Sequence, residues 1–430
     1  GLKPVRDLNG ALVLTGTGLA GDDLSARLGR TPISASLRLD DWENPTLRVG
    51  LRAPRLDLAD AGLTHPRRDV SLRDVDLKAD YRNDAWQIRN LSATLNQTTL
   101  RAQGVIQEKP EPRADLVLSF PFLDIDGMAP LAEIEGGGWT EQSGPRLWTV
   151  VLKAESGRNK ALTFSNLSAR IRYQNDRIDI TDGEVDLFGG KAQGEGRIDL
   201  RQEGRPAYDA RFSLTGADAE QATTALEMPD GFVTGTFSLG GQVQVSGSAR
   251  DDLIRTAAGT LTFKAKDGMI RKFAVLSKVF SILNVSQLFK FQLPDMVSGG
   301  MPYSRITARL SLADGVIVTE DLFIRSNAMN ISVVGKTDLV KGVTEQTIGV
   351  QPLQTVDKVV SRIPVVGWIL SDEDGRVLTV YFDAQGPLDD PVVQAVPVQS
   401  LSKGLLDAFR NLFELPARLF TDTGEVLLGR

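Results

Sequence analysis

One glycine motif in this chain has the spacing of a dinucleotide-binding loop. Gly16, Gly18 and Gly21 match the G-x-G-x-x-G pattern and follow the apolar residues 12–14. A dinucleotide site needs a helix that begins at this loop, because the helix N-terminus binds the pyrophosphate. After Gly29 the sequence instead alternates apolar and polar residues, which is typical of a strand. We therefore expect these glycines to lie within β structure and to bind no nucleotide.

Two acidic segments and one histidine are the other candidates for chemistry. Residues 124–127 (Asp-Ile-Asp-Gly) and 372–375 (Asp-Glu-Asp-Gly) resemble calcium loops but lack the downstream ligands of an EF-hand, so we expect turns there. His65 is the only histidine, and one histidine without cysteine is a poor metal-ligand set. We find no nucleophile elbow, phosphate-binding loop or acid pair at recognisable spacing. The sequence therefore predicts no enzyme, metal or cofactor.

The composition is that of a folded, acidic protein. Its 430 residues are 41% hydrophobic and 24% charged, which suits several domains or one long repeat structure. A formal net charge of −6 gives no basic field, which argues against nucleic acid as a partner. We see no signal peptide and no long apolar run, and we expect a membrane anchor upstream of Gly1.

A long internal repeat sets the architecture. Residue types recur at a displacement of 92 or 94 residues, and the matched pairs are Tyr81 and Tyr173, Asn83 and Asn175, Asp84 and Asp176, Ile88 and Ile180, Leu95 and Leu187, Gly104 and Gly196, Pro112 and Pro206, and Asp124 and Asp218. Asn-Asp pairs tolerate left-handed backbone, so each copy should contain two strands joined by a tight turn. A glycine follows the turn aspartate by 20 residues in both copies, and the same spacing joins Asn9 to Gly29 and Gly315 to Gly335. We predict about four related β units.

Alternation of apolar and polar residues dominates residues 1–230. Tyr208, Ala210 and Phe212, for example, are separated by Asp209 and Arg211. Such alternation predicts strands with one apolar and one polar face, as in an antiparallel sheet shielded from water on one side. Helical patterns are almost absent from this part of the chain, apart from a turn or two near 217–227. Further strands are predicted at 259–265, 307–312, 329–334 and 377–384.

Longer helical stretches enter after residue 230 and suggest three regions. We predict repeated β units over 1–230, a β region with helices near 272–291 and 353–370 over 231–396, and an amphipathic helix and tail over 397–430. Pro364 must break or kink the second helix. The last helix, about 399–415, can dock on its own protein, on a membrane or on a partner.

The stretch 272–291 is apolar on most sides and carries lysines but no acid. One interpretation is a helix buried against a sheet, and the other is a helix that touches lipid with its lysines near phosphates. The residues that would make the membrane or lipid contact are Phe273, Leu276, Phe280, Leu283, Lys278 and Lys290.

Several short motifs after residue 258 carry a family resemblance. They are Gly259-Thr260-Leu261-Thr262-Phe263, Lys266-Asp267-Gly268-Met269-Ile270, Ile282-Leu283-Asn284, Asp314-Gly315, Met329-Asn330-Ile331, Gly335-Lys336-Thr337-Asp338-Leu339, Ile363-Pro364-Val365-Val366-Gly367 and Gly386-Pro387-Leu388-Asp389-Asp390-Pro391-Val392. In these motifs the chain resembles the C-terminal region of AsmA-like proteins of the Gram-negative envelope, especially the large YhdP-type members.

The resemblance implies a fold and a function. AsmA-like proteins look like relatives of the bridge-like lipid-transfer proteins, so we expect a mainly β fold. Its elongated, repeat-built antiparallel sheet would curl into an apolar gutter, with a few amphipathic helices towards the C-terminus. The resemblance also implies a periplasmic protein anchored in the inner membrane. Such a protein would bind phospholipids and protein partners at the inner and outer membranes, and would carry lipid between the two.

We consider two functions for the apolar strand faces. In the first, they form a lipid conduit lined by Leu47, Val49, Leu51, Leu116, Leu118, Phe120, Phe212, Leu214, Leu261, Phe263, Leu310, Leu312, Ile331 and Val333. In the second, the same faces pack against each other in a non-transporting envelope scaffold or regulator that binds protein partners. Sequence alone leaves both open, because apolar alternation looks the same facing lipid or facing another sheet.

Overall fold

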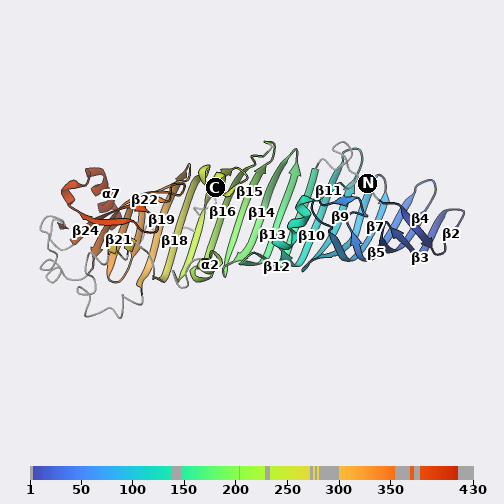
Figure 1. Cartoon of the computed structure of the whole chain (residues 1–430), viewed down its shortest axis with the longest axis horizontal. Helices are drawn as coiled ribbons and strands as arrows, with labels where there is room; N and C mark the ends of the chain where they lie inside the picture. Colours follow the sequence, from blue (N-terminus) through green and yellow to red (C-terminus); the bar gives the residue numbers. More distant parts are fainter. Residues whose placement is uncertain are drawn as a thin grey trace. The chain divides into compact units, whose positions relative to one another are not determined.

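The computed structural model describes residues 3–136, 147–202, 204–227, 233–271, 275–276, 278–279, 300–353, 369–371 and 378–414 (Figure 1). The chain divides into two compact units, Gly1–Asp186 with Arg197–Arg201 (unit 1) and Leu187–Gly196 with Gln202–Arg430 (unit 2). The described chain is mainly β with a few short helices, as predicted. The expected region boundaries at residues 230 and 396 stay predictions.

Unit 1 consists of strands, and its long strands pair with the next long strand along the chain. The strands are β1 (Val5–Asn9), β2 (Val13–Leu14), β3 (Gly18–Leu28), β4 (Thr31–Asp40), β5 (Thr46–Asp57), β6 (Leu63–Thr64), β7 (Ser71–Arg82), β8 (Ala85–Leu95), β9 (Thr98–Gln107), β10 (Arg113–Asp124), β11 (Glu135–Gly136), β12 (Leu147–Asn159) and β13 (Leu162–Gln174). The unit boundary falls within β14 (Arg177–Leu187) and β15 (Gly190–Asp199). Gly18 and Gly21 lie in β3 and no helix begins there, which fits the expected β structure.

One pairing in unit 1 is parallel, which the sequence did not predict. Strands β10 and β12 pair in parallel, whereas the other pairs described in unit 1 are antiparallel. A parallel pair needs a crossover connection of a dozen or more residues. Here the crossover begins with α1 (Ile125–Met128), η1 (Ala129–Glu133) and β11.

The aspartate that ends β10 organises the start of this crossover. Asp124 caps α1 by accepting a hydrogen bond from the Gly127 backbone N–H at 3.1 Å. Its Oδ2 accepts a second bond from Arg158 Nη2 at 2.6 Å. The Arg158 bond, and then the Gly127 bond, lower the pKa of Asp124. Residues 124–127 are therefore a helix start held by an ion pair, where we expected a simple turn.

The internal repeat is present as a repeated set of contacts. Both residues of each Asn-Asp pair, at 83–84 and 175–176, have φ between 51° and 55°, as predicted for left-handed turns. The hydroxyl of Tyr81 donates to the aspartate of the first turn at 3.5 Å, and that of Tyr173 donates to the second at 3.0 Å. The two copies therefore hold their turns in the same way.

The glycine that follows each turn by 20 residues has a steric reason in three of the four places. Gly29 has φ +58°, and a Cβ there would lie 2.3 Å from Asp60 Oδ1. Gly104 has φ +148°, and a Cβ there would lie 2.1 Å from the Asp115 carbonyl oxygen. Gly335 has φ +154°, and its Cβ would lie 2.3 Å from the Glu345 carbonyl oxygen. At Gly104 and Gly335, only glycine permits both this backbone and this close approach of the next strand.

Unit 2 is a second run of sequential antiparallel strands with short helices between them. Its elements are β16 (Ala207–Asp218), α2 (Ala219–Ala225), β17 (Thr236–Ser246), α3 (Arg250–Arg255), β18 (Ala258–Ile270), β19 (Met301–Ala313), β20 (Val316–Arg325), β21 (Met329–Asp338), β22 (Val343–Pro352), β23 (Ile369–Ser371), β24 (Leu378–Pro387), β25 (Val392–Val396), η3 (Val398–Ser400) and α7 (Lys403–Glu414). The four strands predicted between 259 and 384 and the short helix near 217–227 are confirmed.

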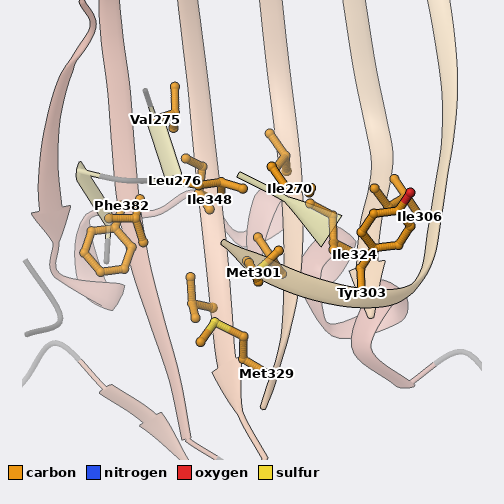
Figure 2. Close-up of a cluster of buried hydrophobic side chains, with 14 of the residues drawn as sticks. Ile270, Val275, Leu276, Met301, Tyr303, Ile306, Ile324, Met329, Ile348 and Phe382 are labelled. Atoms are coloured by element: carbon orange, nitrogen blue, oxygen red, sulfur yellow. The ribbon is translucent and has the colours of Figure 1, made fainter. Parts of the chain in front are cut away.

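The hydrophobic core of unit 2 lies on one face of β18–β24. Val275, Leu276 and Val279 pack on this face against residues such as Ile348 and Phe382, and all five are less than 9% exposed. Figure 2 shows Val275, Leu276, Ile348 and Phe382 among the side chains of this cluster. In this part of unit 2 the chain's own residues therefore cover the apolar face.

Helix α7 covers the other face of the same strands. Phe409 is fully buried, and its ring lies 5.1 Å from that of Tyr381. Phe413 meets Phe323 of β20 with ring centroids 6.2 Å apart. The amphipathic helix predicted at 399–415 is confirmed as α7, and it docks on its own protein in this structure.

The helix predicted at 353–370 is wrong at its C-terminal end. Ile369 belongs to the short strand β23, where it pairs with Val380 of β24. A bulky β-branched side chain suits a strand, and tertiary pairing decides over a short helical pattern. Residues 354–368, including Pro364, lie outside the described residues.

Candidate functional site

The main candidate site in unit 1 is one continuous apolar face. Cross-strand pairing places its side chains in register from β4 to β13. The members of this apolar face of unit 1 are Ala35, Leu37, Leu39, Leu47, Val49, Leu51, Ala53, Val75, Leu77, Ala79, Tyr81, Trp86, Ile88, Leu91, Ala93, Leu100, Ala102, Gly104, Ile106, Ala114, Leu116, Leu118, Phe120, Trp148, Val150, Leu152, Ala154, Leu167, Ala169, Ile171 and Tyr173. Such a face offers an apolar surface for a hydrocarbon chain.

Exposure differs between small and large residues on this face. Ala53 is 1% exposed and Ala114 is fully buried, because larger neighbours flank them. Leu116 and Leu118 remain only partly buried. The predicted lining residues Leu47, Val49 and Leu51 are also partly buried, and Phe120 is 5% exposed. The structure therefore brings all six predicted residues of unit 1 to one face, where most of the large side chains still reach solvent.

The opposite face of unit 1 is polar. A hollow of about 440 Å³ lies over β3–β8 beside Gly50, which leaves a gap between charged neighbours. Around it Arg48 pairs with Asp40 at 2.7 Å, and Arg52 lies 3.6 Å from Asp76. Both signs of charge line this hollow, so an acyl chain there would displace water from ionic groups. The apolar face is therefore the better lipid candidate.

The predicted lining residues of unit 2 also share one face. Register places Phe212 opposite Gly241, Gly241 opposite Leu261, and Leu261 opposite Leu310. Adjacent pairings put Leu214, Phe263 and Leu312 on the same side. Leu214 is 7% exposed, whereas Phe212, Leu261, Phe263, Leu310 and Leu312 are partly buried.

Two other predicted lining residues lie inside the covered core of unit 2. Ile331 is fully buried and Val333 is 7% exposed, both in the cluster with Leu276. A lipid could reach them only if the segment around Leu276 left this face. That Ile331 and Val333 line a lipid path stays a prediction.

The predicted lipid-contact helix is only partly described. Leu276 is 5% exposed in the protein core, which favours the alternative of a helix packed on its own sheet. Lys278 Nζ pairs with Asp390 and donates to the Pro391 carbonyl oxygen at 2.7 Å. Phe273, Phe280, Leu283 and Lys290 lie outside the described residues.

One edge of the apolar face of unit 1 is covered by the chain itself. Leu58 and Val70, from the loop after β5, form a buried cluster with Leu95. Met128, Leu131 and Ile134 of the crossover pack on this cluster, and β11 pairs with β6. Leu72 belongs to both this cluster and the core of the apolar face. We call this side the covered edge.

A buried carboxylate holds the loop of the covered edge in place. Asp60 is 3% exposed, and its Oδ2 accepts hydrogen bonds from the backbone N–H groups of Arg30 and Thr31 at 3.0 and 3.1 Å. The Thr31 hydroxyl donates a third bond at 2.9 Å. Burial opposes ionisation, but these bonds outweigh it and lower the pKa of Asp60.

The other edge of this face carries a row of aromatic residues, which sequence reasoning missed. Tyr81 pairs with Trp86 across β7 and β8, with ring centroids 5.0 Å apart, and Trp148 pairs with Tyr173 across β12 and β13. Between the two pairs, Trp86 lies opposite Ile106, Ile106 opposite Ala114, and Ala114 opposite Trp148. All these residues therefore form one row across the strands. We call it the aromatic edge. Its signal in the sequence is an aromatic residue next to one end of β7, β8, β12 and β13.

The aromatic rings lie between apolar and polar surroundings. All four rings are partly buried, and the two tyrosine hydroxyls donate to carboxylates at the strand ends, as described above. Partial burial, followed by the charges of Glu108 and Asp84, raises the pKa of Tyr81. Its hydroxyl therefore stays a hydrogen-bond donor at neutral pH.

Within the described residues, no three His, Asp or Glu side chains gather closely enough to hold a metal ion. His65 directly follows β6 and accepts a hydrogen bond at Nδ1 from the Arg67 backbone N–H at 3.0 Å. Among the described helices, none has the length and apolar character that crossing a bilayer requires.

Comparison with known families adds a second, independent observation. The sequence profile of the family described as "YhdP protein" matches residues 140–393, which is more than half of the chain. The chain belongs to the YhdP family. The match covers all but the last strand of unit 2 and reaches back into β12 and β13, so the YhdP family includes part of the apolar face of unit 1. No curated protein and no solved structure matched the chain in the same comparisons.

Proposed function

We propose that this chain carries phospholipids between the inner and outer membranes of a Gram-negative envelope, along its apolar strand faces. Acyl tails would lie against these faces while headgroups stay in solvent. The chain would act in the periplasm, with protein partners at both membranes. This transport needs no covalent chemistry and no cofactor.

The observation that carries the proposal is the apolar face of unit 1, whose large side chains stay partly exposed. Large aliphatic side chains continue in register over successive strands, yet residues such as Leu116 and Leu118 remain partly exposed. Contiguous apolar surface that stays accessible to solvent often marks a binding site. Membership of the YhdP family, whose AsmA-like relatives belong to the envelope, supports a lipid as the bound molecule.

The physical driving force suits transport as well as binding. Each CH₂ group that leaves water gains about 0.8 kcal/mol. Leucine, valine, isoleucine and alanine repeat along the strands, so neighbouring positions offer a tail similar surroundings. A tail can then move from one strand to the next without entering a deep energy minimum.

The covered core of unit 2 favours a second function for that part of the molecule. Val275, Leu276 and Val279 pack on part of the apolar face of β18–β24, and α7 packs on the other face of the sheet. A sheet covered on both sides suits a scaffold that binds protein partners. Transport through unit 1 and scaffolding by the covered end of unit 2 are compatible.

Photo-crosslinking tests which faces meet lipid. A photoreactive amino acid at Leu118, Phe212 or Phe263 is expected to capture phospholipid in the full chain purified from a bacterial envelope. The matched control is the same amino acid at Gln103, which is exposed on the polar face, one strand away from Leu118. Equal capture at the control position and at the three apolar positions would show that lipid binding is not confined to the apolar faces. Capture at none of the four positions would also contradict the proposal.

A further inference from the structure

The two edges of the apolar face of unit 1 differ in what lies beyond them. At the covered edge, Leu58, Val70 and Leu95 are each 5–7% exposed and pack against the crossover segment. A phospholipid headgroup placed there would enter an apolar cluster. A charged group in such surroundings costs several kcal/mol unless it is paired. A headgroup is therefore disfavoured beside this cluster.

The aromatic edge offers the opposite surroundings. The connections described there are residues 41–45, the turns 83–84 and 175–176 and the link 108–112, which together carry carboxylates and cations. Lys109 lies 3.9 Å from Asp84, and Arg113 lies 3.7 Å from Asp115, so both signs of charge are present at the surface. A zwitterionic headgroup can stay hydrated beside such residues.

Tyrosine and tryptophan are suited to the boundary between these surroundings. Both have an apolar ring with a polar end, and both concentrate where hydrocarbon meets water in membranes. Tyr81 and Tyr173 direct their hydroxyls to carboxylates at the turns while their rings belong to the apolar face. The aromatic row therefore lies where a lipid would change from tail to headgroup.

The width of the face fits this orientation. From Trp148 at the aromatic edge to Ala154 near the covered edge there are six residues along β12. At about 3.3 Å per residue this distance is roughly 20 Å. One leaflet of a bilayer has a hydrocarbon thickness of about 15 Å, half of the roughly 30 Å core. An acyl tail can therefore lie along the strands with its headgroup at the aromatic edge.

We infer that phospholipids on unit 1 share one orientation, with headgroups at the aromatic edge of Tyr81, Trp86, Trp148 and Tyr173 and tail ends toward the covered edge. This inference rests on the proposed lipid-binding function and adds a defined headgroup side to it. The aromatic residues position the lipid at the level of its glycerol backbone.

Fluorescence quenching by spin-labelled lipid tests the orientation. In the full chain, Trp42, Trp139, Trp148 and Trp368 are replaced by phenylalanine, which leaves Trp86 as the only tryptophan. The protein is loaded with phosphatidylcholine that carries a nitroxide either on the choline or deep in the acyl chain. We expect the headgroup label to quench Trp86 at least about twofold more strongly than the deep label.

A second reporter serves as the matched comparison. In the same background, Trp86→Phe with Leu118→Trp places the fluorophore in the middle of the apolar face. The deep label should quench this reporter more strongly. The orientation is wrong if the labels quench clearly but the headgroup label is not the stronger quencher of Trp86, or the deep label is not the stronger quencher of the reporter at position 118. Lipid binding itself would still stand in that case. No quenching of either reporter by any label would contradict lipid binding itself, and the orientation with it.

Discussion

An arginine in place of Leu118 is expected to stop lipid passage along unit 1 and to leave the fold intact. Leu118 lies within the apolar face and is partly exposed, so a long arginine can direct its guanidinium to water. A tail that passes would have to desolvate this charge, which costs several kcal/mol. Since each 1.4 kcal/mol on a barrier is a factor of ten, we expect the transfer rate to fall at least about tenfold.

The measurement is phospholipid transfer between donor and acceptor vesicles by the full chain, followed with a fluorescent lipid. Gln103→Arg is the matched control because it adds the same charge on the polar face, beside the strand that holds Leu118. The control should transfer at the unmodified rate. Circular dichroism should show the same strand content in both variants. Undiminished transfer by a folded Leu118→Arg variant would contradict a path over this face.

Truncation of Phe382 to alanine should destabilise unit 2 far more than the same change at Phe212. Phe382 is fully buried in the core that Val275 and Leu276 cover, so its removal leaves a cavity. Such losses cost about 3–5 kcal/mol. Phe212 lies on the uncovered part of the face, opposite Gly241, and is only partly buried. Its truncation should cost less than about 2 kcal/mol, because less surface leaves an apolar environment.

Urea unfolding of the full chain, followed by far-ultraviolet circular dichroism, compares the two variants. The midpoint for unit 2 should fall much further for Phe382→Ala than for Phe212→Ala, with a similar slope in both. Equal losses would mean that Phe212 is as enclosed as Phe382. The proposal that lipid reaches the face of unit 2 around Phe212 would then be wrong.

The sequence predicted the repeated β units because their signals are local. An Asn-Asp turn, a glycine 20 residues later and alternation around both are visible without knowledge of pairing. The structure confirms them through the left-handed φ angles at 83–84 and 175–176 and through the close approach at Gly104. The face of each strand could also be predicted, because successive side chains point to opposite sides.

The aromatic edge could not be predicted, because it depends on register between distant strands. Trp86 and Trp148 come into one row only through Ile106 and Ala114. The parallel pairing of β10 and β12 places Trp148 opposite Ala114 and so brings Trp148 into this row. Alternation alone would have suggested an antiparallel neighbour, since the crossover through α1 has no strong signal in the sequence.

The helices near the C-terminus show a similar limit. Amphipathicity predicted α7, but it could not tell whether Phe409 would meet a membrane or Tyr381 of the same chain. The apolar pattern around Leu276 was compatible with lipid or with a core. Contacts with Ile348 and Phe382 place Leu276 in the core of unit 2. A pattern shows which face is apolar, and only tertiary packing shows what covers it.

Native mass spectrometry of the full chain, purified from a bacterial envelope without delipidation, tests lipid carriage most directly. We predict several phospholipids bound to each chain, because the apolar face of unit 1 extends over successive strands from β4 to β13. Lipid extraction should then recover diacyl phospholipids in the same ratio. A chain that remains lipid-free, and stays so after incubation with phospholipid vesicles, would contradict lipid transport and favour a scaffold.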